Sequence, residues 1–195
     1  MPKLLFQGHG SYRLTSDDGR IIYIDPYKGK GYDAPADLIL VTHQHRDHNQ
    51  IERCAQKLGC RVITNEEALA GGKHNFFDVD GITIQAVEAS NKLHDPKQCV
   101  GYIITLDGVK IYASGDTSMT KQMETFAVLE LDYALFPGDG IFNMNPEKAA
   151  ECAKLVGAKH NILIHLKPGE SYRKKTEKWQ ATNKLIIEPG EEITL

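Results

Sequence analysis

The sequence predicts an α/β fold in which two β-sheets pack face to face and helices cover their outer sides. Segments with the apolar or alternating pattern of strands occur in two rounds, and each round leads into a segment with helical spacing and a further strand. The chain has 195 residues, of which 41% are hydrophobic and 25% charged, which suits a single globular domain over residues 1–195.

The first round of elements fills the N-terminal third of the chain. Three short strands come first, over residues 4–6, 12–14 and 20–24. The apolar run 38–42 predicts a buried strand, and the spacing of apolar residues over 49–58 predicts a helix that Gly59 would cap. A strand over 61–64 would then complete a β-α-β unit.

The second round begins after an irregular stretch. Strands are expected over residues 81–87, 100–106, 109–113 and 132–136, with a hairpin signal at Asp107-Gly108. The helix expected over 146–156 has an N-cap asparagine, a proline at its first position and a glycine directly after it. A last strand is expected over 160–165, and the charged run 173–178 is interpreted as the solvated face of a helix.

The charge balance disfavours a nucleic-acid-binding protein. The chain carries 23 Lys and Arg against 26 Asp and Glu, a formal net charge of −3, whereas nucleic-acid footprints are usually basic. The N-terminal Met1–Gly8 lacks the apolar run of a signal peptide, and no segment is apolar enough to span a bilayer. We expect a cytoplasmic protein that acts on a small molecule, without nucleic-acid or membrane partners; its oligomeric state stays open.

The most informative stretch of the sequence is Val41–His48, which concentrates three histidines and one aspartate. The two-residue repeat of a strand would put His43 and His45 on the same side. Asp47 and His48 follow on a turn and can face the same point. Imidazoles and a carboxylate that converge in this way suit Zn²⁺, Mn²⁺ or Fe²⁺.

Further possible ligands recur where other strands are expected to end. These residues are His94, Asp116 and His165. In layered α/β folds, sites gather at the carboxyl ends of strands, so segments far apart in the sequence can meet there. His160 begins its strand instead of ending it, and we exclude it from the ligand set.

Together these motifs resemble the metallo-β-lactamase superfamily, and most closely its small metal-dependent hydrolases akin to ascorbate phosphate lactonase. The resemblance covers nearly the whole chain and also includes Gly8-His9-Gly10, Ile24-Asp25-Pro26, Val100-Gly101-Tyr102 and Asn143-Met144-Asn145-Pro146-Glu147. The ligand set is specific to the superfamily and does not identify a substrate.

The resemblance implies an αββα four-layer sandwich that holds two divalent metal ions between its sheet edges, Zn or Mn first and Fe as another option. The ligands of one metal would be His43, His45 and His94. The ligands of the second would be Asp47, His48 and His165. Asp116 would bridge the two metals and be catalytic.

Other residues have roles that the resemblance implies less directly. Asp25 matches a buried aspartate that supports the ligand loop. His9 matches a position close to the cleft and would contact substrate, although a turn role is equally open. Lys167 could meet a phosphate or carboxylate, in a segment where relatives commonly have a tyrosine after the last histidine. Asp47 would orient the attacking water or accept its proton, and no residue is a clear acid for the leaving group.

The expected function is metal-dependent hydrolysis of a small molecule, a lactone or a phosphoester. Two metals that share a water lower its pKa, and the resulting hydroxide attacks a carbonyl or phosphoryl centre. Three alternatives stay open: a phosphodiesterase that processes RNA, an iron-dependent sulfur oxygenase, and a metal-binding protein without turnover.

Overall fold

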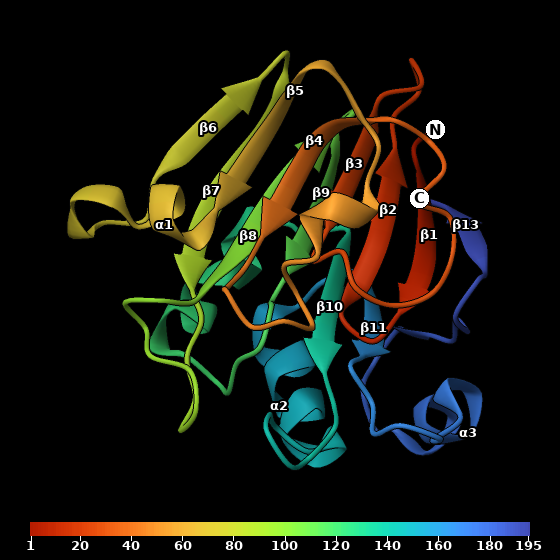
Figure 1. The fold of residues 1–195 in the computed structure, drawn as a ribbon. Helices are drawn as coiled ribbons and strands as arrows, with labels where there is room; N and C mark the ends of the chain where they lie inside the picture. The colour runs from red at the N-terminus through yellow and green to blue at the C-terminus, as the bar shows by residue number, and fades with distance from the viewer.

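The computed structural model describes residues 1–195 and contains two β-sheets packed against each other (Figure 1). The first sheet has the order β13-β1-β2-β3-β4-β5 and the second the order β12-β11-β10-β9-β8-β7-β6. Strands β3, β4 and β5 run parallel, as do β9 to β12, and all other neighbours are antiparallel.

The two sheets contain thirteen strands, and three α-helices and three 3-10 helices lie between them along the chain. The strands of the first sheet are β1 (Lys3–Gly8), β2 (Ser11–Thr15), β3 (Ile21–Ile24), β4 (Ala36–Val41), β5 (Gln56–Thr64) and β13 (Glu192–Thr194). Those of the second are β6 (Phe76–Val79), β7 (Ile82–Glu88), β8 (Val100–Leu106), β9 (Val109–Ala113), β10 (Tyr133–Pro137), β11 (His160–Ile164) and β12 (Lys184–Leu185). The α-helices are α1 (Asn65–Ala68), α2 (Pro146–Val156) and α3 (Tyr172–Lys178), and the 3-10 helices are η1 (Ile51–Arg53), η2 (Ala70–Gly72) and η3 (Lys121–Leu129).

The main hydrophobic core lies between the two sheets and extends under α2 and η3. It combines inward side chains of the first sheet, such as Leu14 and Leu40, with side chains of the second, such as Ile104 and Phe136. Burial of apolar area on this scale is the main favourable term in the folding of a domain. The predicted α/β fold of two packed sheets is therefore confirmed.

The helix predicted over residues 146–156 is also confirmed, and so are the signals that define it. Helix α2 begins at Pro146, and the N-cap Asn145 accepts a hydrogen bond from the backbone N–H of Lys148. Gly157 ends the helix in the left-handed conformation, at φ 70°. The charged run near the C-terminus forms α3, as expected.

The helix predicted over residues 49–58 is wrong. Only Ile51–Arg53 form a short 3-10 turn, and the backbone is already extended at Cys54 (φ −91°, ψ 118°). Strand β5 then begins at Gln56, well before the expected start at Arg61.

Pairing with β4 explains why this segment is extended. The N–H of Ala36 donates to the carbonyl oxygen of Ala55 at 2.7 Å, and Ala36 pairs with Gln56. This tertiary pairing satisfies backbone groups that a helix would satisfy locally, and the helical spacing of a few apolar residues does not outweigh it. Gly59, at φ 85°, lies inside the strand and does not cap a helix.

The outer face of the first sheet is consequently covered by a thin layer. A second, smaller apolar cluster there contains Tyr23, Ile39 and Cys54, with Tyr32 and Ile51 packed against it. The second sheet is covered by α2, which contacts β10, β11 and η3 (Figure 1). None of the helices has the length and apolar character needed to cross a membrane.

The strand ends place the candidate site. Strands β3, β4, β9, β10 and β11 each lead directly into a loop that carries one or more of the site's polar side chains. The turn after β1 and the loop between β7 and β8 supply the rest. Because both sheets contribute, the site lies where the sheet edges meet.

Two substitutions in β5 test the extended conformation. Ile63 is fully buried in the main core, so Ile63→Ala should lower the free energy of unfolding by about 2–5 kcal/mol. Leu58 would lie on the apolar face of a helix, but in the strand it is fully exposed. Leu58→Ala should therefore change stability by less than about 0.5 kcal/mol in urea unfolding. A large loss of stability from Leu58→Ala would contradict the strand.

Candidate metal centre

The structure brings all seven expected ligands to one place. His43, His45, Asp47 and His48 follow β4, His94 lies between β7 and β8, Asp116 follows β9, and His165 follows β11. Asp25, after β3, and His9, after β1, lie against the same group of side chains. Lys167 is apart from them: it is exposed and lines a neighbouring pocket of about 360 Å³, which His9 also lines.

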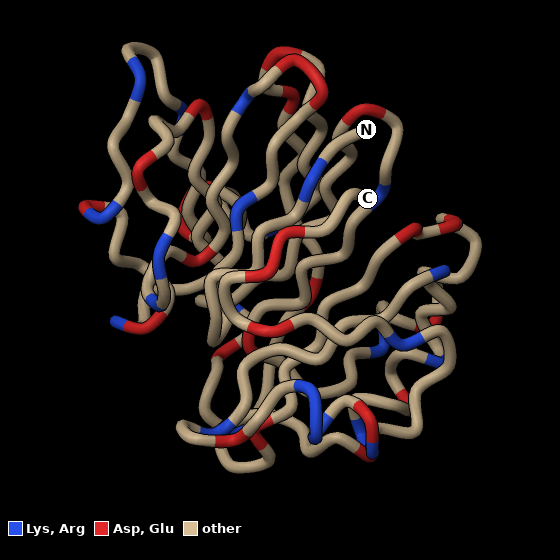
Figure 2. Tube along the Cα trace, turned by 90° about the vertical axis from the view of Figure 1, so that its right-hand side faces the viewer, with Lys and Arg blue, Asp and Glu red and all other residues tan.

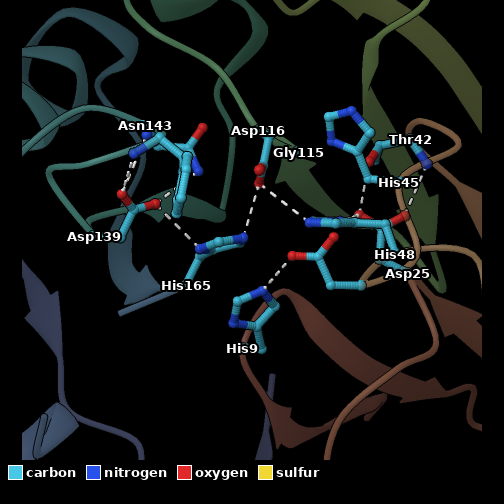
Figure 3. Close-up of polar contacts among 12 residues, drawn as sticks. His9, Asp25, Thr42, His45, His48, Gly115, Asp116, Asp139, Asn143 and His165 are labelled. Carbon is cyan, nitrogen blue, oxygen red and sulfur yellow. Dashed lines mark hydrogen bonds and ion pairs between the residues drawn. The ribbon is translucent and has the colours of Figure 1, made fainter. Parts of the chain in front are cut away.

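Asp116 lies at the centre of this group (Figure 3). Its Oδ1 is 3.3 Å from Nε2 of His165 and 3.4 Å from Nε2 of His48. Its Oδ2 is 3.5 Å from Nε2 of His94. The two carboxylate oxygens therefore face different histidines, which is the arrangement needed for a carboxylate between two cations.

The side chains that could bind a metal ion form three sets, which share His43 and His48. Within each set the ligand atoms lie within 4.8 Å of one another. One set is His43, His45 and His94; another is His9, Asp47, His48 and His165; a third is His43, His48 and Asp116. In the first of these sets, Nδ1 of the exposed His45 is 3.1 Å from Nε2 of the buried His94.

Several polar atoms in the centre are buried without a hydrogen-bond partner. They are Nε2 of His43, Nε2 of His48, Nε2 of His165 and Oδ1 of Asp116. A buried polar group without a partner costs free energy and is uncommon in native proteins. Imidazole nitrogens and carboxylate oxygens aimed at a shared point fit a transition-metal cation, which would satisfy them all.

The histidines of the first sheet are fixed through their Nδ1 atoms by Asp25. Nδ1 of His48 is 2.8 Å from Oδ2 of this carboxylate, and Nδ1 of His43 is 3.0 Å from Oγ1 of Thr42. The Thr42 hydroxyl donates in turn to Oδ2 of Asp25 at 2.7 Å, and its N–H donates to Oδ1 at 2.8 Å. With Nδ1 held in this way, both rings direct Nε2 at the centre, and Nε2 can bind a metal ion when it carries no proton.

The histidines of the second sheet are held in the same way by other residues. Nδ1 of His94 is 2.8 Å from Oδ1 of Asn91. Nδ1 of His165 is 3.2 Å from Oδ2 of Asp139, which also accepts a hydrogen bond from Nδ2 of Asn143 (Figure 3). Each buried histidine thus has one nitrogen held by the protein and one directed at Asp116.

The pKa values of the buried rings reflect this environment. Burial lowers the pKa of His43 to about 2 and lowers that of His94, so both rings are neutral near pH 7. Burial acts in the same direction on His48, but the carboxylates of Asp116 and Asp25 outweigh it and raise the pKa of His48 to about 9. His48 therefore carries a proton that a metal ion would have to displace.

The central carboxylate is ionised in spite of its burial. Burial raises the pKa of Asp116, but His48, His165 and His43 face it and together lower its pKa to about 2. Asp139 is also ionised. Burial raises its pKa, but the hydrogen bonds from His165 and from backbone N–H groups outweigh burial, so the pKa of Asp139 lies below its usual value.

His9 contacts the site through Asp47. Its Nε2 is 3.0 Å from Oδ2 of Asp47, and its ring packs on that of His165 with centroids 3.7 Å apart. This hydrogen bond is the first cause of the lowered pKa of Asp47. The ring of His9 therefore has a partner within the protein.

The turn that carries His9 needs glycine next to it. A Cβ atom on Gly10 would lie 2.9 Å from Cε1 of His48, closer than real contacts allow. The backbone of His9 also accepts a hydrogen bond from the N–H of His165 at 2.8 Å. The turn after β1 therefore packs directly against the group of candidate metal ligands.

Three supporting residues were not assigned to the site from the sequence. They are Thr42, Asn91 and Asp139. Asp139 also stabilises the turn that follows it, because its Oδ1 accepts hydrogen bonds from backbone N–H groups of that turn. Short polar residues next to a ligand or at the end of a buried strand were the available signal.

A cleft of about 410 Å³ opens over the centre. Five of its lining residues belong to the cluster: His45, Asp47, His94, Asp116 and His165. The two others are Leu93 and Phe142. A small molecule can therefore reach the cluster from solvent.

The comparisons with known proteins agree with this geometry. A family model described as the beta-lactamase superfamily domain matches residues 3–165. Two relatives named UPF0173 metal-dependent hydrolases, from Thermococcus onnurineus and Pyrococcus furiosus, are each 30% identical to this chain, and the alignments cover 100% of this chain and of each relative.

Solved structures show the same fold. Igni18, described as a metallo hydrolase from Ignicoccus hospitalis, superposes with a TM-score of 0.78 at 23% identity, covering 98% of this chain and 97% of that one. The metallo-beta-lactamase fold protein YhfI from Bacillus subtilis gives a TM-score of 0.76 at 15% identity, with 100% of both chains covered. The chain therefore belongs to the metallo-β-lactamase superfamily, among its metal-dependent hydrolases.

Proposed function

We propose that this hydrolase binds two divalent metal ions and cleaves a small-molecule lactone or phosphoester. Zn and Mn are the preferred candidates for the metal, and Fe is the alternative. The observation that carries the proposal is the set of unpartnered, buried Nε2 atoms of His43, His48 and His165 around the ionised carboxylate of Asp116. Their Nδ1 atoms are held in place, so the rings are already oriented for ligation.

The two metal ions would divide the ligands along the sets found around Asp116. The first ion would bind His43, His45 and His94. The second would bind Asp47, His48 and His165. Asp116 would bridge them, because its two oxygens face His94 on one side and His48 and His165 on the other.

When bound, divalent metals lower the pKa of water and polarise a substrate oxygen. The protein supplies the geometry for this chemistry. Asp47 is half-exposed at the cleft, with one oxygen fixed by His9, so its other oxygen can orient a water or accept its proton. Asp139 and Asn91 keep His165 and His94 from rotating during the reaction.

The charge distribution supports a small-molecule substrate over RNA. Basic and acidic residues are interspersed in the view of Figure 2, which shows no continuous basic stripe. No Lys or Arg lines the cleft over the cluster. RNA-processing activity would need contacts to a phosphate backbone, which usually come from such residues. We further propose that the protein acts in the cytoplasm, without a nucleic-acid or membrane partner.

Metal content and a hydrolysis panel test the proposal. Protein purified without chelator should contain, or take up, two equivalents of Zn or Mn per chain. The loaded protein should hydrolyse at least one class among lactones, phosphodiesters and thioesters, and a strong chelator should abolish that activity. Absence of bound metal, with none taken up on addition, would refute the proposal. If the protein is active only with iron, the iron-dependent sulfur oxygenase would be favoured over the hydrolase.

The substitution Asp116→Asn tests the bridge. Asparagine keeps the shape but loses the charge and one strong oxygen ligand, so two cations would repel each other more strongly. The variant should fold, hold less metal than the parent and lose activity by about 100-fold or more. The exposed Asp95, in the adjoining pocket, gives a matched control: Asp95→Asn should keep full occupancy. Full metal occupancy in folded Asp116→Asn would require a different bridge.

Metal affinity should depend on pH because of His48. With a pKa of about 9, this ring is protonated at neutral pH and must lose its proton to bind a metal ion. Affinity of the second site should therefore rise by about tenfold per pH unit between pH 6.5 and 8.5. His43 and His94 have lowered pKa values and add no such dependence there. Competition titrations with a calibrated chelator measure the slope, and a flat profile would contradict the protonated His48.

A further inference from the structure

The cleft over the metal centre has an apolar rim formed by Leu93 and Phe142. Both residues are 58% exposed. They are the only cleft-lining residues outside the histidine and aspartate cluster. Exposed apolar side chains beside convergent polar groups are typical of ligand-binding sites.

Leu93 is fixed relative to the centre by Asn91. The Oδ1 atom of Asn91 accepts the backbone N–H of Leu93 at 2.8 Å and lies 2.8 Å from Nδ1 of His94. One amide oxygen therefore sets the position of a ligand histidine and of the apolar side chain beside it.

Phe142 is fixed in the same way by Asp139. Oδ1 of this carboxylate accepts the backbone N–H of Phe142 at 2.7 Å, and Oδ2 lies 3.2 Å from Nδ1 of His165. Nδ2 of Asn91 also donates to Oδ1 of Asn143 at 2.9 Å, which ties the two turns together. The apolar rim is thus built into the hydrogen-bond network that orients the histidines.

The surroundings of the rim do not favour a phosphorylated group. Leu93 also lines an adjoining pocket of about 430 Å³, whose charged residues outside the cluster are Glu66, Asp95 and Lys97. With one lysine and two carboxylates, this pocket has no excess of positive charge. Recognition of a phosphate group usually relies on Arg, Lys or a helix N-terminus.

We propose that Leu93 and Phe142 bind an uncharged hydrocarbon group of the substrate next to the bond that is cleaved. The substrates are then lactones or esters with an apolar substituent. This inference rests on the proposed metal-dependent hydrolysis and narrows its substrate class.

Two hydroxamates test the rim without a known substrate. Acetohydroxamate and octanohydroxamate share a metal-binding head and differ only in an apolar chain. Calorimetry on the metal-loaded protein should give at least about tenfold tighter binding of octanohydroxamate, because the chain is buried against the rim. Leu93→Ser and Phe142→Ser should each reduce this ratio, while metal content and acetohydroxamate affinity stay unchanged.

Val128 provides the matched control. It is 83% exposed on η3 and lines neither pocket, so Val128→Ser should leave the ratio of the two affinities unchanged. If the wild-type protein binds the two hydroxamates with equal affinity, the proposed role of the rim would be refuted, and the proposed metal centre would not be affected. A protein that takes up no metal would overturn the proposed function, and the rim proposal would fall with it.

Discussion

A buried histidine can face a metal ion in a fixed orientation only when its other ring nitrogen has a partner, and the structure meets this condition at every buried histidine of the centre. Asp25 serves His48 directly and His43 through Thr42, while Asn91 and Asp139 serve His94 and His165. Each of these partners comes from a loop that follows a strand. The positions of the strand ends therefore decide whether the centre can form at all.

The two sheets are joined by hydrogen bonds at the centre itself. The N–H of Val100 donates to the carbonyl oxygen of Thr42 at 3.0 Å, and the hydroxyl of Tyr102 donates to that of Val41 at 2.9 Å. On the other side, the N–H of His165 donates to the oxygen of His9. These contacts hold the ligand loops of one sheet against those of the other, so the geometry of the site is coupled to the packing of the whole sandwich.

Local signals in the sequence were sufficient to predict the elements whose structure depends on residues close to them in the chain. The cap and proline at Asn145-Pro146 defined α2 correctly, and the strand ends located all seven possible ligands in one region. The segment 49–58 was mispredicted because pairing with β4 lies outside its own sequence. Short strands such as β12 and β13 gave too little pattern to recognise.

The support of the ligands was harder to predict than the ligands themselves. Asn91 lies three residues before His94, and its role depends on how the loop folds back onto the ring. Asp139 and His165 are far apart in the sequence and meet only through the parallel pairing of β10 and β11. A polar residue in a loop has many possible partners, and only the tertiary structure selects one.

The extended form of residues 56–64 also has a consequence for the surface. Strand β5 is the last strand of its sheet, so one row of its backbone groups has no neighbouring strand. Such open edges can pair with a strand of another molecule, and charged side chains oppose this. Lys57 and Arg61 lie on this strand, where Asp37 and Glu67 pair with them. Lys57 and Arg61 thus place charged side chains on the edge strand, which is one way in which native proteins discourage pairing with another molecule.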